Sequence, residues 1–362
     1  MWNFLKLSGD TLTKRRRVVM AGIGLVMLCG GCTGDGELGS IHHSRTNVLL
    51  LTLCTLRADH LGVYGYNGGV SPAIDSLATM GVTFDRAMAP ASWTRASIAS
   101  TITGMYPRTL DIEEPTGESN NRQLHGSFRT LPECVSELGY YTIGITANPN
   151  THSVFGFDQG YDFYEDTGKY LWRSGYSERK RSAGDVNASL LEQLRERPRD
   201  QKFFAHLTYV DVHAPLDDGV GSYVMSIGSG YTALYDRALR YLDGAIAELL
   251  REIAAMGVED LLVIITSDHG EAFQERGFEG HARKVYRETS EIPFIISLPF
   301  RLEPGLVIRS RTSNVDVWPT LFDLLGIEAG EMDGRSRLPE ILATARAGSA
   351  PDDDAPAIAH LD

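Results

Sequence analysis

The chain has 362 residues, of which 43% are hydrophobic and 22% are charged, an ordinary composition for a folded globular protein. This length allows one large α/β domain or two modest ones. The formal net charge of −13 argues against a nucleic-acid partner, because phosphate backbones are bound by basic surfaces.

Residues 1–32 have the pattern of a targeting segment. The basic run Lys14–Arg17 precedes the apolar run Val18–Leu28, which is too short to span a bilayer. Small residues then precede Cys32, as in the lipobox of bacterial lipoproteins, so Cys32 is predicted to carry a lipid. An ordinary secretory signal or an uncleaved anchor is the alternative. The segment therefore predicts an exported lipoprotein of the bacterial cell envelope, membrane-anchored and periplasmic or surface-exposed.

Residues 33–45 are rich in Gly, Ser and His, and this composition predicts a tether between the membrane and a folded domain. Two further cysteines, Cys54 and Cys134, lie beyond the tether. An exported chain can pair such cysteines. The sequence does not decide whether these two form a disulfide.

From residue 46 onward, strand-length apolar runs alternate with helical patterns. Runs that are apolar on both faces are typical of a parallel sheet covered by helices, and they occupy residues 48–53, 141–147, 203–210, 261–266 and 294–298. Helical patterns occupy residues 72–80, 95–103, 131–138, 183–195 and 232–256. The last carries an apolar stripe at helical spacing, formed by Leu234, Ala238, Tyr241, Leu242, Ala245, Leu249 and Ile253. The alternation predicts an α/β fold with a doubly wound, mostly parallel sheet and ligands at the carboxyl ends of its strands.

Polar residues follow several of these strands. Cys54 ends the first strand, His213 follows the third, and Asp268-His269 follows the fourth, with His281 a little further on. An Asp-His pair offers a hard oxygen and a borderline nitrogen to a divalent metal. Gly270 is expected to let the backbone turn sharply after this pair. At the end of the second strand, Asn148 and Asn150 are interpreted mainly as turn formers.

Ordered sequence blocks run through the body of the chain. The longest covers Asn47–Tyr66, and the others are Asp75, Gly81–Phe84, Gly104–Pro107, Gly156–Asp162, Asp268–Glu271 and Val315–Thr320. In this order the blocks resemble the sulfatase family (sulfatase N-terminal domain) of the alkaline phosphatase superfamily. The resemblance covers about residues 46–340 and implies a catalytic domain there. Residues 341–362 are then an acidic tail or the truncated start of a C-terminal antiparallel subdomain that is largely missing.

The resemblance implies roles for individual residues. Asp268 and His269 match the metal-binding pair, and His213 and His281 fall where the family contacts the sulfate or phosphate group. Thr94, just before a predicted helix whose N-terminus suits an anion, falls at the nucleophile position. Family members have there a cysteine or serine that is converted to formylglycine. No formylglycine is expected at Thr94, which could instead attack directly as a metal-activated hydroxyl.

Cys54 departs from the family, which has an aspartate metal ligand at this position. Calcium, the metal of most sulfatases, selects oxygen ligands, whereas zinc accepts a thiolate. The resemblance therefore predicts one divalent metal held by Asp268, His269 and Cys54, either calcium or zinc. The alternative is that Cys54 is a buried apolar thiol with no ligand role.

Together these features predict an exported sulfatase-like hydrolase of sulfuric or phosphoric esters. Its substrate would be an anionic ester, for example in a sulfated or phosphorylated glycan. Because Cys54 and Ile98 replace an aspartate and an arginine of the family, a second hypothesis remains. In this second hypothesis the chain is a degenerate, non-catalytic member that binds such a glycan.

Overall fold

The computed structural model describes residues 46–112, 123–166, 180–217, 223–224, 230–282, 284–299 and 305–347. The predicted targeting segment with Cys32, the predicted tether and residues 348–362 of the predicted C-terminal tail lie outside these ranges. Within the described ranges, no helix is both long and apolar enough to cross a membrane.

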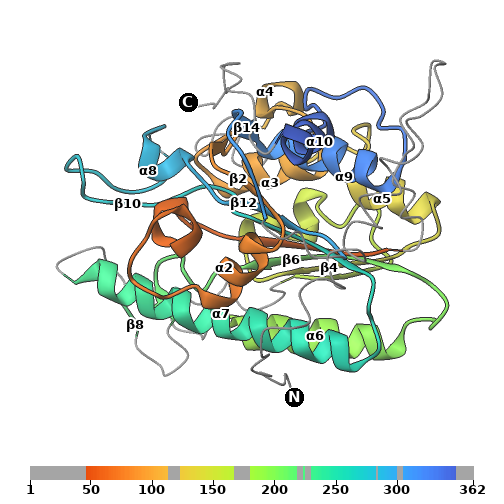
Figure 1. Cartoon of the computed structure of the whole chain (residues 1–362), viewed down its shortest axis with the longest axis horizontal. Coiled ribbons are helices and arrows are strands. Elements are labelled where there is room, and N and C mark those ends of the chain that lie inside the picture. Colours follow the sequence, from red (N-terminus) through yellow and green to blue (C-terminus); the bar gives the residue numbers. More distant parts are fainter. Residues whose placement is uncertain are drawn as a thin grey trace, which may run out of the picture. The chain divides into compact units, whose positions relative to one another are not determined.

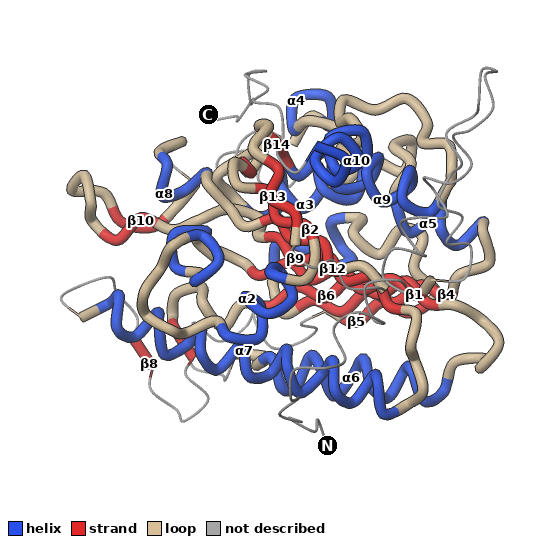
Figure 2. Tube along the Cα trace, in the orientation of Figure 1, coloured by secondary structure: helices blue, strands red, loops and turns tan. Residues whose placement is uncertain are grey.

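An eight-stranded sheet lies at the centre of the domain (Figures 1 and 2). Its strand order is β13-β2-β12-β9-β1-β6-β4-β5, with bounds β1 (Asn47–Leu53), β2 (Val82–Phe84), β4 (Tyr141–Thr146), β5 (Phe163–Glu165), β6 (Phe203–Tyr209), β9 (Leu261–Thr266), β12 (Phe294–Ser297) and β13 (Leu306–Ile308). β1 is parallel to both neighbours, β6 and β9, whereas β12 is antiparallel to β9 and β2. The predicted α/β class with a mostly parallel sheet is confirmed.

Helices cover both faces of this sheet (Figure 1). One face carries α2 (Pro72–Thr79), α6 (Ala183–Glu196) and α7 (Tyr231–Ala255). The other carries α3 (Thr94–Thr103), α4 (Pro107–Leu110), α5 (Leu131–Glu137), α9 (Val317–Leu325) and α10 (Leu338–Ala347). Every predicted helix is present. Two of them, α5 and α6, begin with a capping box, formed by Thr130 with Glu133 and by Ser182 with Asp185.

Shorter elements connect these layers. The short strands are β3 (Ala87–Met88), β7 (Leu216–Asp217), β8 (Tyr223–Val224), β10 (Ala272–Phe273), β11 (Glu279–Gly280) and β14 (Thr312–Ser313), and the short helix is α8 (Arg287–Ser290). Single 3₁₀ turns occupy η1 (Ala58–His60), η2 (Gly62–Tyr64), η4 (Pro149–Thr151), η5 (Ser153–Phe155) and η7 (Asn314–Asp316). The hairpin β10–β11 is the one that matters for the site, because it leads into His281.

The buried face of α7 differs from the predicted stripe. Tyr235, Leu239 and Ile246 are fully buried but were absent from the prediction. Leu234, Tyr241 and Ala245 are only partly buried, and α7 packs against both α6 and α2. The fold also answers whether Cys54 and Cys134 form a disulfide. Cys54 at the end of β1 and Cys134 in α5 are both free and buried.

Candidate active site

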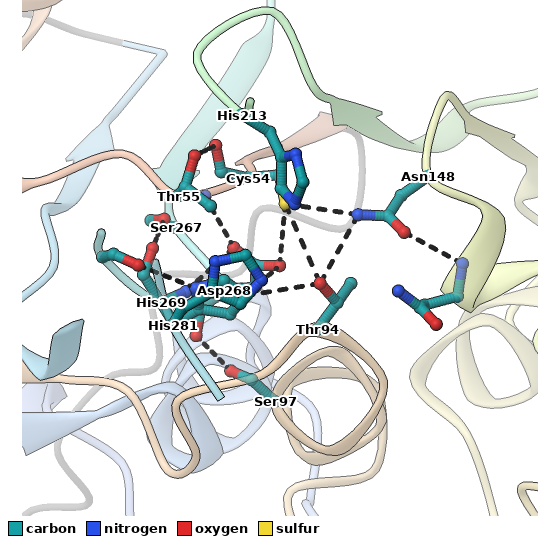
Figure 3. A network of polar contacts seen from close by, with 12 residues as sticks. Cys54, Thr55, Thr94, Ser97, Asn148, His213, Ser267, Asp268, His269 and His281 are labelled. Atoms are coloured by element: carbon teal, nitrogen blue, oxygen red, sulfur yellow. Dashed lines mark hydrogen bonds and ion pairs between the residues drawn. The ribbon is translucent and has the colours of Figure 1, made fainter. Parts of the chain in front are cut away.

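Polar side chains from several separate segments meet at the carboxyl edge of the sheet (Figure 3). Cys54 follows β1, Asn148 follows β4, His213 follows β6, and Asp268 and His269 follow β9. Thr94 is the first residue of α3, with Trp93 as the N-cap. These segments converge because β1, β4, β6 and β9 are parallel, so their carboxyl ends lie at one edge.

Cys54, Asp268 and His269 form a compact cluster of possible metal ligands. One donor atom from each lies within 4.8 Å of the other two. Cys54 Sγ is 3.1 Å from Asp268 Oδ2, and His269 Nε2 is 3.4 Å from the same oxygen. All three residues are completely buried. The structure thus brings together the three predicted metal residues.

Backbone N–H groups fix the Asp268 carboxylate. Its Oδ1 accepts hydrogen bonds from Thr55 N at 3.0 Å and His269 N at 2.8 Å, which leaves Oδ2 facing the cluster. Thr55 reaches this position with a φ of 61°, in the left-handed region that a β-branched residue rarely adopts. Such strain is typical of functional sites. Sequence patterns carry no signal for it, and Thr55 was missed.

Local contacts also fix the His269 ring. Its Nδ1 is 2.9 Å from Gly270 O, so Nδ1 carries the proton and Nε2 presents its lone pair to the cluster. Gly270 does not have a positive φ, so the expected turn does not rest on the left-handed conformation that favours glycine. Glycine is required there for space, because a Cβ would lie 2.2 Å from the backbone oxygen of Glu288.

Thr94 lies beside the cluster. Its Oγ1 is 3.3 Å from His269 Nε2 and 3.9 Å from Cys54 Sγ. Asn148 joins them, since its Nδ2 lies 3.2 Å from Cys54 Sγ and 3.5 Å from Thr94 Oγ1. Asn148 Oδ1 accepts from Asn150 N at 2.9 Å, which orients the amide so that its donor side faces Thr94. The turn interpretation was therefore incomplete: Asn148 both caps η4 and faces the site.

The two predicted substrate-contacting histidines lie beside the cluster (Figure 3). The His281 ring centroid is 4.3 Å from that of His269 and 5.1 Å from that of His213. His281 Nδ1 pairs with Glu271 Oε1 at 2.9 Å. His213 Nδ1 is 2.5 Å from Ala214 O. The Lys180 ammonium donates to the carbonyls of Val210, His213 and Pro215 and so holds the loop that carries His213.

Burial dominates the electrostatics of this site. Burial first, and then the charge of Asp268, raises the pKa of the Cys54 thiol well above its usual value. Burial, together with the charges of His281 and Lys180, holds the pKa of His213 well below its usual value. Burial also lowers the pKa of His269. The protein thus favours a neutral thiol and neutral imidazoles when no cation is present.

Two charged residues near the site have other partners. The Arg95 guanidinium stacks on Phe155 with its Cζ 3.5 Å from the ring centroid, and Arg95 Nε donates to Asn150 O. Asp59 pairs with Arg57 on the surface side of η1.

Comparison with known proteins identifies the family of the chain. A family model described as "Sulfatase" matches residues 46–327. Steryl-sulfatase of Rattus norvegicus is 29% identical over 171 residues, covering 43% of this chain and 29% of that protein. Choline-sulfatase of Rhizobium meliloti (strain 1021) is 36% identical over 119 residues, covering 30% of this chain and 21% of that protein. These matches cover less than a third of either curated relative.

Solved structures show the same architecture. The phosphonate monoester hydrolase of Agrobacterium radiobacter superposes with a TM-score of 0.67 at 18% identity, over 85% of this chain and 78% of that one. At this level of identity the similarity establishes the fold alone.

Proposed function

The chain belongs to the sulfatase family, and from this premise we propose that it hydrolyses sulfuric or phosphoric esters with Thr94 as nucleophile and one divalent metal. The observation that carries the proposal is the position of the Thr94 hydroxyl, 3.3 Å from His269 Nε2 at the edge of the Cys54–Asp268–His269 cluster. A hydroxyl becomes a competent nucleophile only when a base or a metal activates it. This position provides that activation.

The donors of the cluster suit a divalent metal. Cys54, Asp268 and His269 would hold it, because Asp268 Oδ2, His269 Nε2 and Cys54 Sγ all face one point and their other polar atoms are engaged elsewhere. When bound, a divalent metal supplies positive charge that lowers the pKa of a bound hydroxyl and neutralises ester oxygens.

Residues around the proposed metal site would carry out the remaining steps of the reaction. Thr94 Oγ1, once its proton has passed to solvent, attacks the sulfur or phosphorus atom, and the bond from that atom to the leaving oxygen breaks. Asn148 Nδ2, 3.5 Å away, donates a hydrogen bond that stabilises negative charge on the Thr94 oxygen. His281 is supported by Glu271 at Nδ1 and gives a proton from Nε2 to the leaving alcohol. Water then hydrolyses the ester on Thr94. His213, with its pKa lowered by burial, accepts hydrogen bonds through Nε2.

The proposed substrate is an anionic ester. Among proteins of similar fold, one is named a phosphonate monoester hydrolase and another a 2-O GAG sulfatase, the latter superposing with a TM-score of 0.64 at 18% identity. Sulfate and phosphate esters are therefore both candidates, and sulfated or phosphorylated glycans are the natural class to test first.

One observation favours a second function. Two of the candidate ligands already form a hydrogen bond with each other, because the Cys54 thiol donates to Asp268 Oδ2. A chain that kept this arrangement would bind an anionic glycan through Thr94, Asn148 and the two histidines without turning it over. This alternative predicts binding that is independent of added metal.

An assay with paired aryl sulfate and aryl phosphate esters tests the proposal. We expect metal-dependent hydrolysis of at least one ester, reduced at least ~10³-fold in kcat/KM by Thr94→Ala, since removing a nucleophile abolishes nearly all chemistry. Thr101→Ala is the matched control, because Thr101 is a buried hydroxyl on the same helix that donates only to Ser97 O. Undiminished turnover by Thr94→Ala would exclude Thr94 as the nucleophile.

A further inference from the structure

Within the proposed metal site, we propose that Cys54 is a thiolate ligand and makes the cluster select a zinc-type divalent metal over calcium. This inference rests on the proposed function for the presence of a metal and goes beyond it in assigning the metal's identity to one residue. Of the predicted alternatives for Cys54, a ligand in a calcium or zinc site or a buried apolar thiol, it selects the zinc ligand.

The hydrogen bonds around the cluster leave only a few atoms available as ligands. Asp268 offers one oxygen, because Oδ1 already accepts from the N–H groups of Thr55 and His269. His269 offers Nε2, because Nδ1 is paired with Gly270 O. Asn148 offers no oxygen, because Oδ1 accepts from Asn150 N and the amide NH₂ faces inward. The available set is one sulfur, one nitrogen, one carboxylate oxygen and the Thr94 hydroxyl.

The spacing of these four donors suits tetrahedral coordination. Zinc binds sulfur at about 2.3 Å and nitrogen or oxygen at about 2.0–2.1 Å, so neighbouring tetrahedral ligands lie roughly 3.3–3.5 Å apart. The corresponding separations are 3.1 Å for Cys54–Asp268, 3.4 Å for Asp268–His269, 3.3 Å for His269–Thr94 and 3.9 Å for Cys54–Thr94. Neighbouring ligands of a larger ion have similar spacing, so the identity of the donors decides between metals.

The donor set is unfavourable for calcium. Calcium takes about six to eight oxygen ligands and favours bidentate carboxylates. Among the described residues of the cluster, the oxygens are Asp268 Oδ2 and Thr94 Oγ1, and the second Asp268 oxygen is occupied. A sulfur and an imidazole nitrogen are instead typical ligands of zinc and of related transition metals.

The surroundings of Cys54 also favour a metal-bound thiolate. In the metal-free cluster the thiol proton joins Cys54 to Asp268, so a bound cation takes the place of that proton. The Asn148 amide donates toward Sγ at 3.2 Å and would stabilise the negative sulfur. A buried cysteine that acts only as an apolar side chain does not require a carboxylate oxygen and an amide donor at these distances.

Cobalt(II) substitution of the full chain tests the assignment by absorption rather than by activity. The chain is stripped with a chelator and titrated with cobalt(II), and we expect a thiolate-to-cobalt charge-transfer band that saturates at about one ion per chain. Cys54→Ser should lose the band and bind zinc at least ~100-fold more weakly, above the range of outer-shell effects. Cys134→Ser is the matched control and should keep the band, as Cys134 lies in α5.

Competition between metals supplies a readout that needs no variant. We expect zinc to remain bound in the wild-type chain against a large excess of calcium, whereas Cys54→Asp should shift the preference toward calcium. Stoichiometric cobalt without a charge-transfer band, or ready displacement of zinc by calcium, would overturn the inference. Ester hydrolysis by a calcium-loaded wild-type chain would contradict this inference and leave the proposed function intact. A cobalt–thiolate band without any ester hydrolysis would support this inference and contradict the proposed function.

Discussion

The floor and the rim of the site are built differently. The floor consists of Cys54, Asp268 and His269, which directly follow central strands and are completely buried. The rim consists of His213 and His281, which come from a loop after β6 and from the β10–β11 hairpin and are partly exposed. The sheet fixes the floor, whereas individual contacts such as Glu271–His281 and Lys180–Pro215 fix the rim. In the proposed function, a metal binds at the floor and the substrate contacts the rim.

The largest effect that separates the two regions is expected from the rim. His281→Gln should lower kcat/KM by about 10²–10⁴-fold, the usual contribution of a general acid or base, and His213→Gln should also lower it. Metal content should stay unchanged, because neither side chain belongs to the ligand cluster. Steady-state kinetics and elemental analysis of the same samples check this. Loss of metal from either variant would abolish the distinction between floor and rim.

A smaller effect is expected at Asn148, which lies between the two regions. Asn148→Ala should lower kcat/KM by about 10–100-fold, because it removes one donor near the oxygen of Thr94. Asn148→Asp should be more damaging, since it keeps the acceptor for Asn150 N and replaces the donor with a negative charge. Asn150→Ala is the control. Equal activity of all three variants would remove Asn148 from the site.

The smallest effect concerns stability and should leave the site unaffected. His206 lies inside β6, with its ring nitrogens 2.9 Å from Thr52 Oγ1 and 3.1 Å from Tyr161 OH, and burial lowers its pKa to about 4. Below about pH 6.5 the His206 imidazole binds a proton in the unfolded chain, whereas in the folded chain it stays neutral until the pH approaches 4. The free energy of unfolding should therefore fall by about 2 kcal/mol between pH 7 and pH 5 from this group alone.

Denaturant titrations at several pH values check the His206 prediction. His206→Gln should flatten the pH dependence, whatever its effect on absolute stability, and the exposed His125 gives a matched control as His125→Gln. An unchanged slope in His206→Gln would show that the buried histidine does not contribute to acid sensitivity.

The floor was predictable from the sequence and the rest of the site only in part. Apolar runs ending at Cys54 and Asp268 predict parallel strands whose ends meet, so their convergence follows from the pattern alone. The positions of His213 and His281 came from family resemblance, because loops carry no such periodicity. Asn148 was read as a turn residue since its capping role is local, whereas its contact with Cys54 depends on packing across β4, β6 and β1.

Other misses have similar physical causes. The strands β2, β5 and β13 have three residues each, which is too short for a hydrophobic period to appear. The positive φ of Thr55 is imposed by its contacts with Asp268 and Val212, which are remote in sequence. The buried residues of α7 differ from the predicted stripe because contacts with α2 and α6 determine which side chains of α7 are buried.

Metal content tests the central claim, that the floor is a metal site, most directly. Elemental analysis of the full chain should find about one divalent ion per chain, and the ion should be lost in Asp268→Ala, because Asp268 Oδ2 lies between Cys54 and His269. A wild-type chain that binds no divalent metal under any loading condition would contradict this account and favour the non-catalytic alternative.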